Sequence, residues 1–156
     1  MAQTDTIGYL SSSSLGAELT PQELNILARK VKLRAFSKSE ILISEGEIDD
    51  HLYAVAQGLF SVSRTGGRGE ERLSMLGPGA ITGELAFLDG LKRTATVKAE
   101  KDDCYVIALS RADLESLLSD HSALVYKVMR AVVRAAHTTV GKMDATYADL
   151  MHYISG

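Results

Sequence analysis

The spacing of apolar residues changes twice along the chain, and these changes divide it into three parts. Between residues 20 and 31, apolar side chains recur every three or four positions, which is the period of an amphipathic helix. From residue 31 to residue 109, short apolar runs alternate with glycine-bearing turns, and after residue 110 the helical period returns. This order predicts a mainly β domain of the double-stranded β-helix, or jelly-roll, type with an N-terminal helix and C-terminal helices.

The middle part contains several apolar or alternating runs of strand length. We predict strands at residues 31–36, 41–43, 51–56, 60–63, 72–75, 94–99 and 105–109. The glycine-rich residues 65–69 are expected to form a hairpin turn. A phosphate loop would need a Lys-Ser or Lys-Thr pair after the glycines, and none follows here.

Helix signals flank the predicted strands. Thr20, Pro21 and Glu23 form an N-terminal capping pattern for a helix that should run to about Val31. Its inward side would carry Leu24, Ile26, Leu27 and Val31. After the last strand, Ser110 can cap a second helix. That helix would turn Leu114, Leu117 and Leu118 inward.

A long helical pattern begins near Ser122 and could be interrupted at Gly141. Its apolar residues recur at spacings of three and four, in a narrow seam that needs a partner surface. The seam residues are Val125, Met129, Val132, Ala136, Val140, Met143, Tyr147, Leu150 and Ile154. The seam could pack on the chain's own barrel or pair with a second copy, and we favour a homodimer.

We therefore divide the chain into an N-terminal segment (residues 1–19), a jelly-roll domain (20–120) and a long C-terminal helix (121–156). Serines at positions 11–14 favour a loop, so we expect the N-terminal segment to be only partly ordered.

Composition limits the classes of function. A chain of 156 residues with 46% hydrophobic residues can bury one core, and a net charge of −3 leaves no basic surplus for binding nucleic acid. No apolar run is long enough to span a membrane, and the start lacks a secretory signal. Cys104 is the only cysteine, which excludes an internal disulfide. We expect a cytoplasmic protein that does not bind membranes.

The most specific chemistry lies in one segment near the middle of the chain. Gly83 lets the backbone approach a ligand closely, and the short helical turn through Glu84, Leu85 and Ala86 would point N–H groups toward an anion. Arg93 follows nine residues after Glu84 and can bind a phosphate through two parallel hydrogen bonds. A carboxylate beside that phosphate would be repelled, so Glu84 needs a hydroxyl partner, such as that of a sugar. These groups predict a nucleotide site.

The segment resembles the phosphate-binding cassette of cyclic nucleotide-binding domains of the catabolite activator and protein kinase A regulatory subunit type. The matching residues are Gly83, Glu84, Leu85, Ala86 and Phe87, then Arg93, Thr94, Ala95, Thr96 and Val97, and we refer to residues 83–97 as the cassette. The resemblance implies that Arg93 binds the exocyclic phosphate and Glu84 the ribose 2′-OH. Backbone amides of residues 83–86 and near Thr94 would complete the site.

Some alternatives remain open within the cassette. Thr82 stands where relatives often have a phenylalanine, which weakens the aromatic packing but leaves the ligand-facing groups in place. Glu84 and Arg93 could instead form an ordinary surface ion pair in a domain without a ligand, although their spacing favours binding. The Thr94 hydroxyl could serve the phosphate or the 2-amino group of guanine, so cAMP is the expected ligand and cGMP the alternative.

The resemblance also suggests a mechanism. Ligand binding would draw the cassette inward and let a hinge near residues 117–122 bring the long helix over the base. Arg130, Arg134, Thr138 and Thr139 are candidate contacts to the base. The alternative is that Lys127, Arg130 and Arg134 form a solvated cationic stripe.

Catalysis is not expected. A barrel metal site needs converging histidines, and of the four only His51 lies in the predicted barrel. Cys104 has no sequence sign of a positioned base, and a Gly-x-Ser-x-Gly elbow is absent. We expect no metal or cofactor, only the nucleotide ligand.

The predicted function is a stand-alone cyclic nucleotide sensor that passes its signal to an unidentified effector protein. Neither the DNA-reading domain nor the channel pore found in relatives fits in 156 residues. The alternative is a ligand-free interaction module whose long helix binds a partner regardless of nucleotide.

Overall fold

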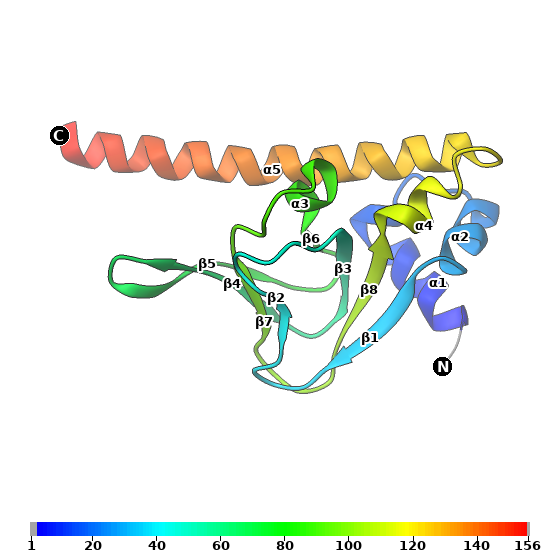
Figure 1. The fold of residues 1–156 in the computed structure, drawn as a ribbon, viewed down its shortest axis with the longest axis horizontal. Coiled ribbons are helices and arrows are strands. Elements are labelled where there is room, and N and C mark those ends of the chain that lie inside the picture. Colours follow the sequence, from blue (N-terminus) through cyan, green and yellow to red (C-terminus); the bar gives the residue numbers. More distant parts are fainter. Residues whose placement is uncertain (1–2, 156) are drawn as a thin grey trace.

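The computed structural model describes the backbone of residues 3–155 and the side chains of residues 5–138 and 148–155. Two four-stranded antiparallel sheets form a β-roll, helices pack around one of them, and one long helix crosses the molecule (Figure 1). In chain order the helices are α1 (Gln3–Ser12), the 3-10 helix η1 (Ser14–Gly16), α2 (Pro21–Ala28), α3 (Glu84–Asp89), α4 (Arg111–Glu115) and α5 (Ser122–Ser155). The strands are β1 (Lys32–Phe36), β2 (Ile41–Ile43), β3 (His51–Gln57), β4 (Phe60–Gly66), β5 (Gly69–Leu76), β6 (Ile81–Thr82), β7 (Thr96–Ala99) and β8 (Cys104–Ser110).

The sheets confirm the predicted mainly β fold with helices at both ends. One sheet has the order β1-β8-β3-β6 and the other β2-β7-β4-β5, so strands that are distant in sequence lie side by side. The predicted turn at residues 65–69 is the tip of a hairpin in which β4 pairs with β5 from Phe60↔Leu76 to Gly66↔Gly69. The two-residue strand β6 was not predicted, because two residues carry no readable alternation.

The sheet that contains β3 and β8 is buried on both faces. Leu52 and Ile107 point to a core shared with the helices, while Tyr53 and Val106 point to a second core between the sheets. Successive side chains of a strand face opposite sides, so a strand covered on both sides needs apolar residues throughout. This explains the continuous apolar run of β8.

The loop predicted at the serines of the N-terminal segment is not present in the described residues. The serines at 11–14 end α1 and begin η1 instead of forming a loop. Leu10, Leu15 and Leu19 are buried in the helical core. These three leucines repeat at intervals too irregular to suggest a helix, but each one removes apolar surface from water and so anchors the segment.

The capping pattern of α2 is present as predicted. Thr20 accepts a hydrogen bond from the backbone of Glu23, and Glu23 accepts one from the backbone of Thr20, with Pro21 as the first helical residue. The helix ends at Ala28 and not near Val31. Its side chains Leu24 and Leu27 are buried, as is Val31, and Ile26 is partly buried.

The C-terminal helices differ from expectation in two details. Ser110 caps α4, and Leu114 and Leu117 are buried, but Leu118 is 51% exposed. The long helix α5 is continuous through Gly141. Its first three turns pack into the helical core through Leu124, Val125, Val128 and Val132. The rest runs past α3 and above the β-roll in the view of Figure 1.

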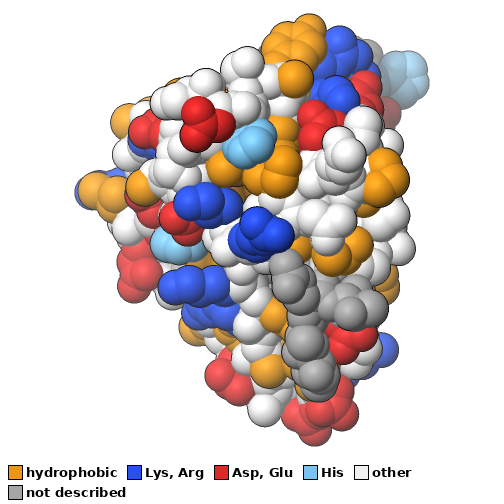
Figure 2. Space-filling model, turned by 90° about the vertical axis from the view of Figure 1, so that its right-hand side faces the viewer, with side chains coloured by type: hydrophobic (Ala, Val, Ile, Leu, Met, Phe, Trp, Pro, Cys, Tyr) orange, Lys and Arg blue, Asp and Glu red, His pale blue; other side chains and the backbone are white. Residues whose placement is uncertain are grey.

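Surface charge on the described part of the chain is mixed. On the face shown in Figure 2, Lys and Arg side chains lie next to Asp and Glu side chains, with apolar side chains between them. Among the described residues, no helix is long and apolar enough to cross a lipid bilayer.

Candidate functional site: the cassette around Arg93

The cassette begins with a glycine that the backbone requires. Gly83 precedes α3 and has φ 82° and ψ 12°, a left-handed conformation that residues with a side chain rarely adopt. A Cβ atom at this position would lie 2.6 Å from Nη1 of Arg93 and 3.2 Å from the carbonyl oxygen of His51. Gly83 therefore serves both the turn into α3 and the close approach of Arg93.

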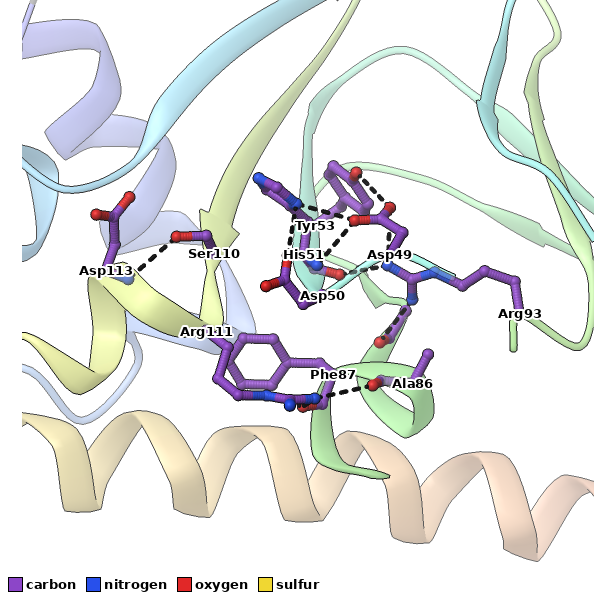
Figure 3. Close-up of polar contacts among 11 residues, drawn as sticks. Asp49, Asp50, His51, Tyr53, Ala86, Phe87, Arg93, Ser110, Arg111 and Asp113 are labelled. Atoms are coloured by element: carbon purple, nitrogen blue, oxygen red, sulfur yellow. Dashed lines mark hydrogen bonds and ion pairs between the residues drawn. The ribbon is translucent and has the colours of Figure 1, made fainter. Parts of the chain in front are cut away.

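Arg93 is deeply buried, with 4% of its surface exposed. Its Nη1 donates to the carbonyl oxygen of Gly83 at 2.9 Å, and its Nη2 donates to the carbonyl oxygen of His51 at 2.6 Å. Nη2 also lies 3.0 Å from Oδ2 of Asp49 (Figure 3). Among the described residues, Arg93 Nε is the buried side-chain nitrogen that has no hydrogen-bond partner.

Asp49 is the counter-ion of Arg93, and it was not predicted. Its carboxylate also accepts a hydrogen bond from the Tyr53 hydroxyl at 2.9 Å and lies 2.9 Å from Nδ1 of His51. Partial burial alone would raise the pKa of Asp49, but the hydrogen bonds from Tyr53, His51 and Arg93 hold it below the ordinary 3.8. Burial, together with the neighbouring Asp49, raises the pKa of Tyr53 to about 12.

The loop before β3 also holds the backbone of Arg93. The Gly46 N–H donates to the Arg93 carbonyl at 2.8 Å, and the Arg93 N–H donates to the Glu47 carbonyl at 2.7 Å. A buried guanidinium needs a carboxylate partner, which is a signal that the sequence does contain. However, Glu45, Glu47, Asp49 and Asp50 lie together in the same loop, and their spacing does not tell which of them meets Arg93.

The structure brings most of the predicted site residues together. Gly83, Glu84 and Ala86 form the start of α3, where Glu84 and Ala86 are buried at 7% and 6% exposure and Leu85 is half-buried. Arg93 reaches this turn through the Gly83 carbonyl, while Thr94 is exposed. The ion pair of Arg93 is therefore a buried one with Asp49, and not the surface pair with Glu84 considered above.

Asp49, Asp50 and His51 also bring potential metal-ligand atoms within 4.8 Å of one another. The carboxylate of Asp49 is already engaged by Arg93, Tyr53 and His51. A divalent cation here would compete with the guanidinium for the same oxygens. We therefore assign these residues to the hydrogen-bond network that holds Arg93. His51 is the first residue of β3, as expected for a strand-entry position.

Two of the candidate lid residues on α5, Arg130 and Arg134, contact the N-terminal segment, and the Thr138 hydroxyl donates to the Arg134 carbonyl within α5. Arg134 Nη2 lies 2.9 Å from Oε1 of Glu18, and Arg130 Nε lies 3.3 Å from Oε2 of the same residue. Lys127 pairs with Glu23 at 2.7 Å. The three cations thus form neither a purely solvated stripe nor contacts to the cassette. Thr139 lies outside the described side chains.

Comparison with known proteins decides the family. The cyclic nucleotide-binding domain family matches residues 33–121. The chain belongs to the cyclic nucleotide-binding domain family. The matched region runs from β1 through α4 and includes the whole cassette, so the family assignment rests on the same residues as the site geometry.

Individual relatives agree with this assignment. The chain is 32% identical over 110 residues to the cyclic AMP receptor protein of Thermus thermophilus, which covers 70% of this chain and 50% of that protein. A cyclic nucleotide-binding domain from Methylobacillus flagellatus has the same fold, with a TM-score of 0.82, 22% identity, and coverage of 94% of this chain and 83% of its own. The regulatory domain of Toxoplasma gondii protein kinase A, solved with cAMP, has a TM-score of 0.65 at 28% identity. The match covers 76% of this chain and 45% of that chain. The chain spans about half the length of the curated relative.

Proposed function

We propose that this protein is a sensor that binds cAMP, with cGMP as the alternative, at the cassette and reports the ligand through α5. It acts by binding and not by catalysis. The cyclic phosphate contacts Arg93, the ribose 2′-OH contacts Glu84, and the backbone from Gly83 to Ala86 and near Thr94 lines the phosphate site.

The observation that carries the proposal is the unpaired Nε–H of Arg93. A buried donor without a partner costs free energy, so its persistence beside the turn of α3 is best explained by an anionic partner. Asp49 and the two carbonyls orient the rest of the guanidinium. A planar guanidinium binds phosphate as well as carboxylate. The relatives named for cyclic AMP support the phosphate of a cyclic nucleotide.

The alternative is a ligand-free interaction module. It is favoured by one observation, namely that Asp49 and two carbonyls already occupy both Nη groups of Arg93. A degenerate member of the family could keep this network solely for its stability. Direct titration with ligand separates the two functions.

We also propose that α5 pairs with the same helix of a second copy. The seam predicted from sequence shifts by one residue at two points, because Val125 and Val132 are buried in this chain's own core. The exposed positions Tyr126 and Val133 take their place. The revised seam alternates spacings of three and four residues, as in a coiled coil. It comprises Tyr126, Met129, Val133, Ala136, Val140, Met143, Tyr147, Leu150 and Ile154, of which Val140, Met143 and Tyr147 lie outside the described side chains.

A second copy suits this seam better than the chain's own barrel does. Tyr126 and Val133 are 63% and 54% exposed, and Leu150 and Ile154 near the far end are 53% and 68% exposed. Tyr126, Met129 and Val133 line a shallow apolar hollow on the surface of α5. In a helix of about 50 Å, the buried residues among the described side chains lie in the first three turns, and the exposed apolar residues offer a face for a partner helix. The proposed location is the cytoplasm, with an effector protein that binds the dimer.

The test is calorimetric titration of the full chain with cAMP, cGMP and 5′-AMP. Wild type is expected to bind a cyclic nucleotide at about micromolar concentration or tighter, and 5′-AMP far more weakly. Arg93→Ala should weaken binding by at least about tenfold, since it removes a charge-assisted contact. Arg64→Ala, on the exposed β4–β5 hairpin, is the matched control and should bind like wild type.

Two results would contradict the proposal in different ways. Absence of binding by both cyclic nucleotides would favour the ligand-free module. Undiminished binding by Arg93→Ala, with its fold verified by circular dichroism, would retain the sensor but refute this site.

A further inference from the structure

An arginine contacts each end of α3. Arg93 donates to the carbonyl oxygen of Gly83, which precedes the helix. At the other end, Nε of Arg111 donates to the carbonyl oxygen of Phe87 at 3.0 Å, and its Nη2 donates to the carbonyl oxygens of Phe87 and of Ala86, the latter at 3.2 Å. Figure 3 shows the two side chains approaching α3 from opposite sides. The role of Arg93 follows from the proposed ligand site, but that site gives no role to Arg111.

The position of Arg111 suits the end of a short helix. The last carbonyl groups of a helix lack partners within it and carry a partial negative charge, which a guanidinium neutralises. Gly90 ends α3 in the left-handed conformation, with φ 70°. A Cβ atom there would lie 3.6 Å from the Arg111 guanidinium, within ordinary contact. The guanidinium carbon also lies 6.0 Å from the centre of the Phe87 ring.

Arg111 belongs to a different element from the helix that it contacts. It is the first residue of α4, and its backbone N–H donates to the carbonyl oxygen of Asp50 at 3.1 Å. The adjacent Ser110 pairs with His51, whose carbonyl oxygen accepts a hydrogen bond from Arg93. Arg111 therefore joins the cassette helix, the turn that holds Arg93 and the start of α4.

Apolar packing continues this connection into α5. Phe87 is 2% exposed and lies in the same core cluster as Leu117, after α4, and Leu124 and Val128 of α5. Apolar packing is non-directional, so it fixes the orientation of α3 less specifically than hydrogen bonds do. The hydrogen bonds of Arg111 are directional and fix the end of α3 relative to α4.

We propose that Arg111 is the positioning residue through which a displacement of α3 reaches α4 and α5. The inference rests on the proposed function, because the displacement is the one that a cyclic nucleotide would cause at Arg93. Without the Arg111 guanidinium, the cassette still binds its ligand, but α5 no longer follows it. If Arg111 only capped α3, its removal would lower the stability of the fold but would not separate ligand binding from the movement of α5.

Hydrogen exchange measured by mass spectrometry with and without saturating cAMP tests the proposal on the full chain. In wild type, cAMP should slow amide exchange in residues 84–89 and in residues 122–138. Arg111→Met keeps the apolar stem but removes the donors, and should bind cAMP within about tenfold of wild type. In Arg111→Met, cAMP should still slow amide exchange in residues 84–89. The slowing of exchange that cAMP causes in residues 122–138 should fall by at least about half. Arg111→Lys keeps the charge and should be intermediate, and Arg64→Met is the matched control.

Each outcome bears on the proposal. Wild-type protection of α5 in both Arg111 variants would overturn it and leave Arg111 as a helix cap. If Arg111→Met does not fold, the comparison of Arg111→Lys with wild type decides. Wild type that binds cAMP without protecting α5 would refute the coupling but keep the sensor. Wild type that binds no cyclic nucleotide would refute the proposed function itself, and this inference with it.

Discussion

Two arginine–carboxylate pairs of nearly equal length hold the two functional regions of the molecule. In the cassette, Arg93 and Asp49 are 3.0 Å apart and their side chains are 3% and 25% exposed. On α5, Arg134 and Glu18 are 2.9 Å apart, but their side chains are 58% and 33% exposed. Water and salt compete with the second pair and hardly reach the first. The contribution of each pair to stability is therefore set by its burial, and not by its length.

The difference fits the roles proposed for the two regions. A site that recognises a phosphate needs its guanidinium fixed before the ligand arrives, and the buried network around Arg93 provides this. In the proposed function α5 moves on binding, and the exposed pairs that Arg130 and Arg134 form with Glu18 cost little to break. The predictions below test this contrast, starting with the buried pair.

Asp49→Ala should have the largest effect on stability. It leaves the buried guanidinium of Arg93 without its counter-ion, which costs several kcal/mol for fully buried pairs. Because Asp49 is one quarter exposed, we expect the lower part of that range, about 2 kcal/mol. Urea unfolding measures the loss, and Asp50→Ala, at the neighbouring and more exposed carboxylate, is the control. Equal losses in the two variants would show that burial does not rank the contacts.

The same pair gives a pH dependence of defined sign. The pKa of Asp49 is lowered in the folded state, so its contribution is fully present above the ordinary 3.8 and is lost as the pH falls through the folded value. The stability difference between wild type and Asp49→Asn should stay constant from pH 7 to about pH 5 and shrink below about pH 4. A difference that shrank between pH 7 and pH 5 would identify another titrating group.

The cassette could be predicted from sequence only in part. Gly83, Glu84 and Arg93 were predicted as site residues because a glycine, an acid and a base stand at the spacing that the cassette pattern requires. Asp49 was missed because it is 44 residues from Arg93, and only the pairing of distant strands brings the two together. Arg111 was also missed. Its partners are backbone carbonyls of a distant segment, and such partners have no sequence signature.

Gly83→Ala should have the next largest effect. The left-handed backbone conformation is strained for alanine. The added Cβ would also lie only 2.6 Å from Nη1 of Arg93, which would have to move. We expect a loss of stability of about 1–2 kcal/mol and a weaker affinity for cAMP. Gly77→Ala is the matched control, because an added Cβ there meets nothing within 4 Å. Wild-type affinity in Gly83→Ala would mean that Arg93 need not be seated against this turn.

Val133→Glu should change assembly while leaving the folded chain nearly unaffected. Val133 is 54% exposed in the single chain, so a charge there costs its folding little, but it would be buried in a helix pair. Light scattering with size-exclusion chromatography should show a dimer for wild type and a monomer for the variant. Ala123→Glu, at an exposed position outside the seam, should remain dimeric. A monomeric wild type would remove the proposed dimer.

The start of α5 shows why sequence spacing alone does not place the seam. Sequence spacing revealed the apolar residues, but Val125 and Tyr126 are both apolar neighbours, and the periodicity alone does not say which faces the core. The structure separates them, since Val125 is 6% exposed and Tyr126 63%. The same uncertainty applied to Leu117 and Leu118, of which only the first is buried.

Glu18→Gln should have the smallest effect. It breaks the exposed pairs with Arg130 and Arg134, whose hydrogen bonds and charges hold the pKa of Glu18 below its ordinary value despite some loss of hydration. The melting temperature should fall slightly at low salt and not at all at about 1 M salt, where exposed charges are screened. A decrease as large as that of Asp49→Ala would contradict the ranking by burial.

The central claim is that the unpaired Nε–H of Arg93 binds the phosphate of a cyclic nucleotide. Nitrogen–proton NMR of the arginine Nε–H groups tests it directly, with the Arg93 signal identified by its absence in Arg93→Lys. Addition of cAMP should shift this signal downfield and saturate at one ligand per chain, whereas adenosine, which lacks phosphate, should leave it unchanged. Binding of cAMP without a change in the Arg93 signal, or an equal shift with adenosine, would contradict the account.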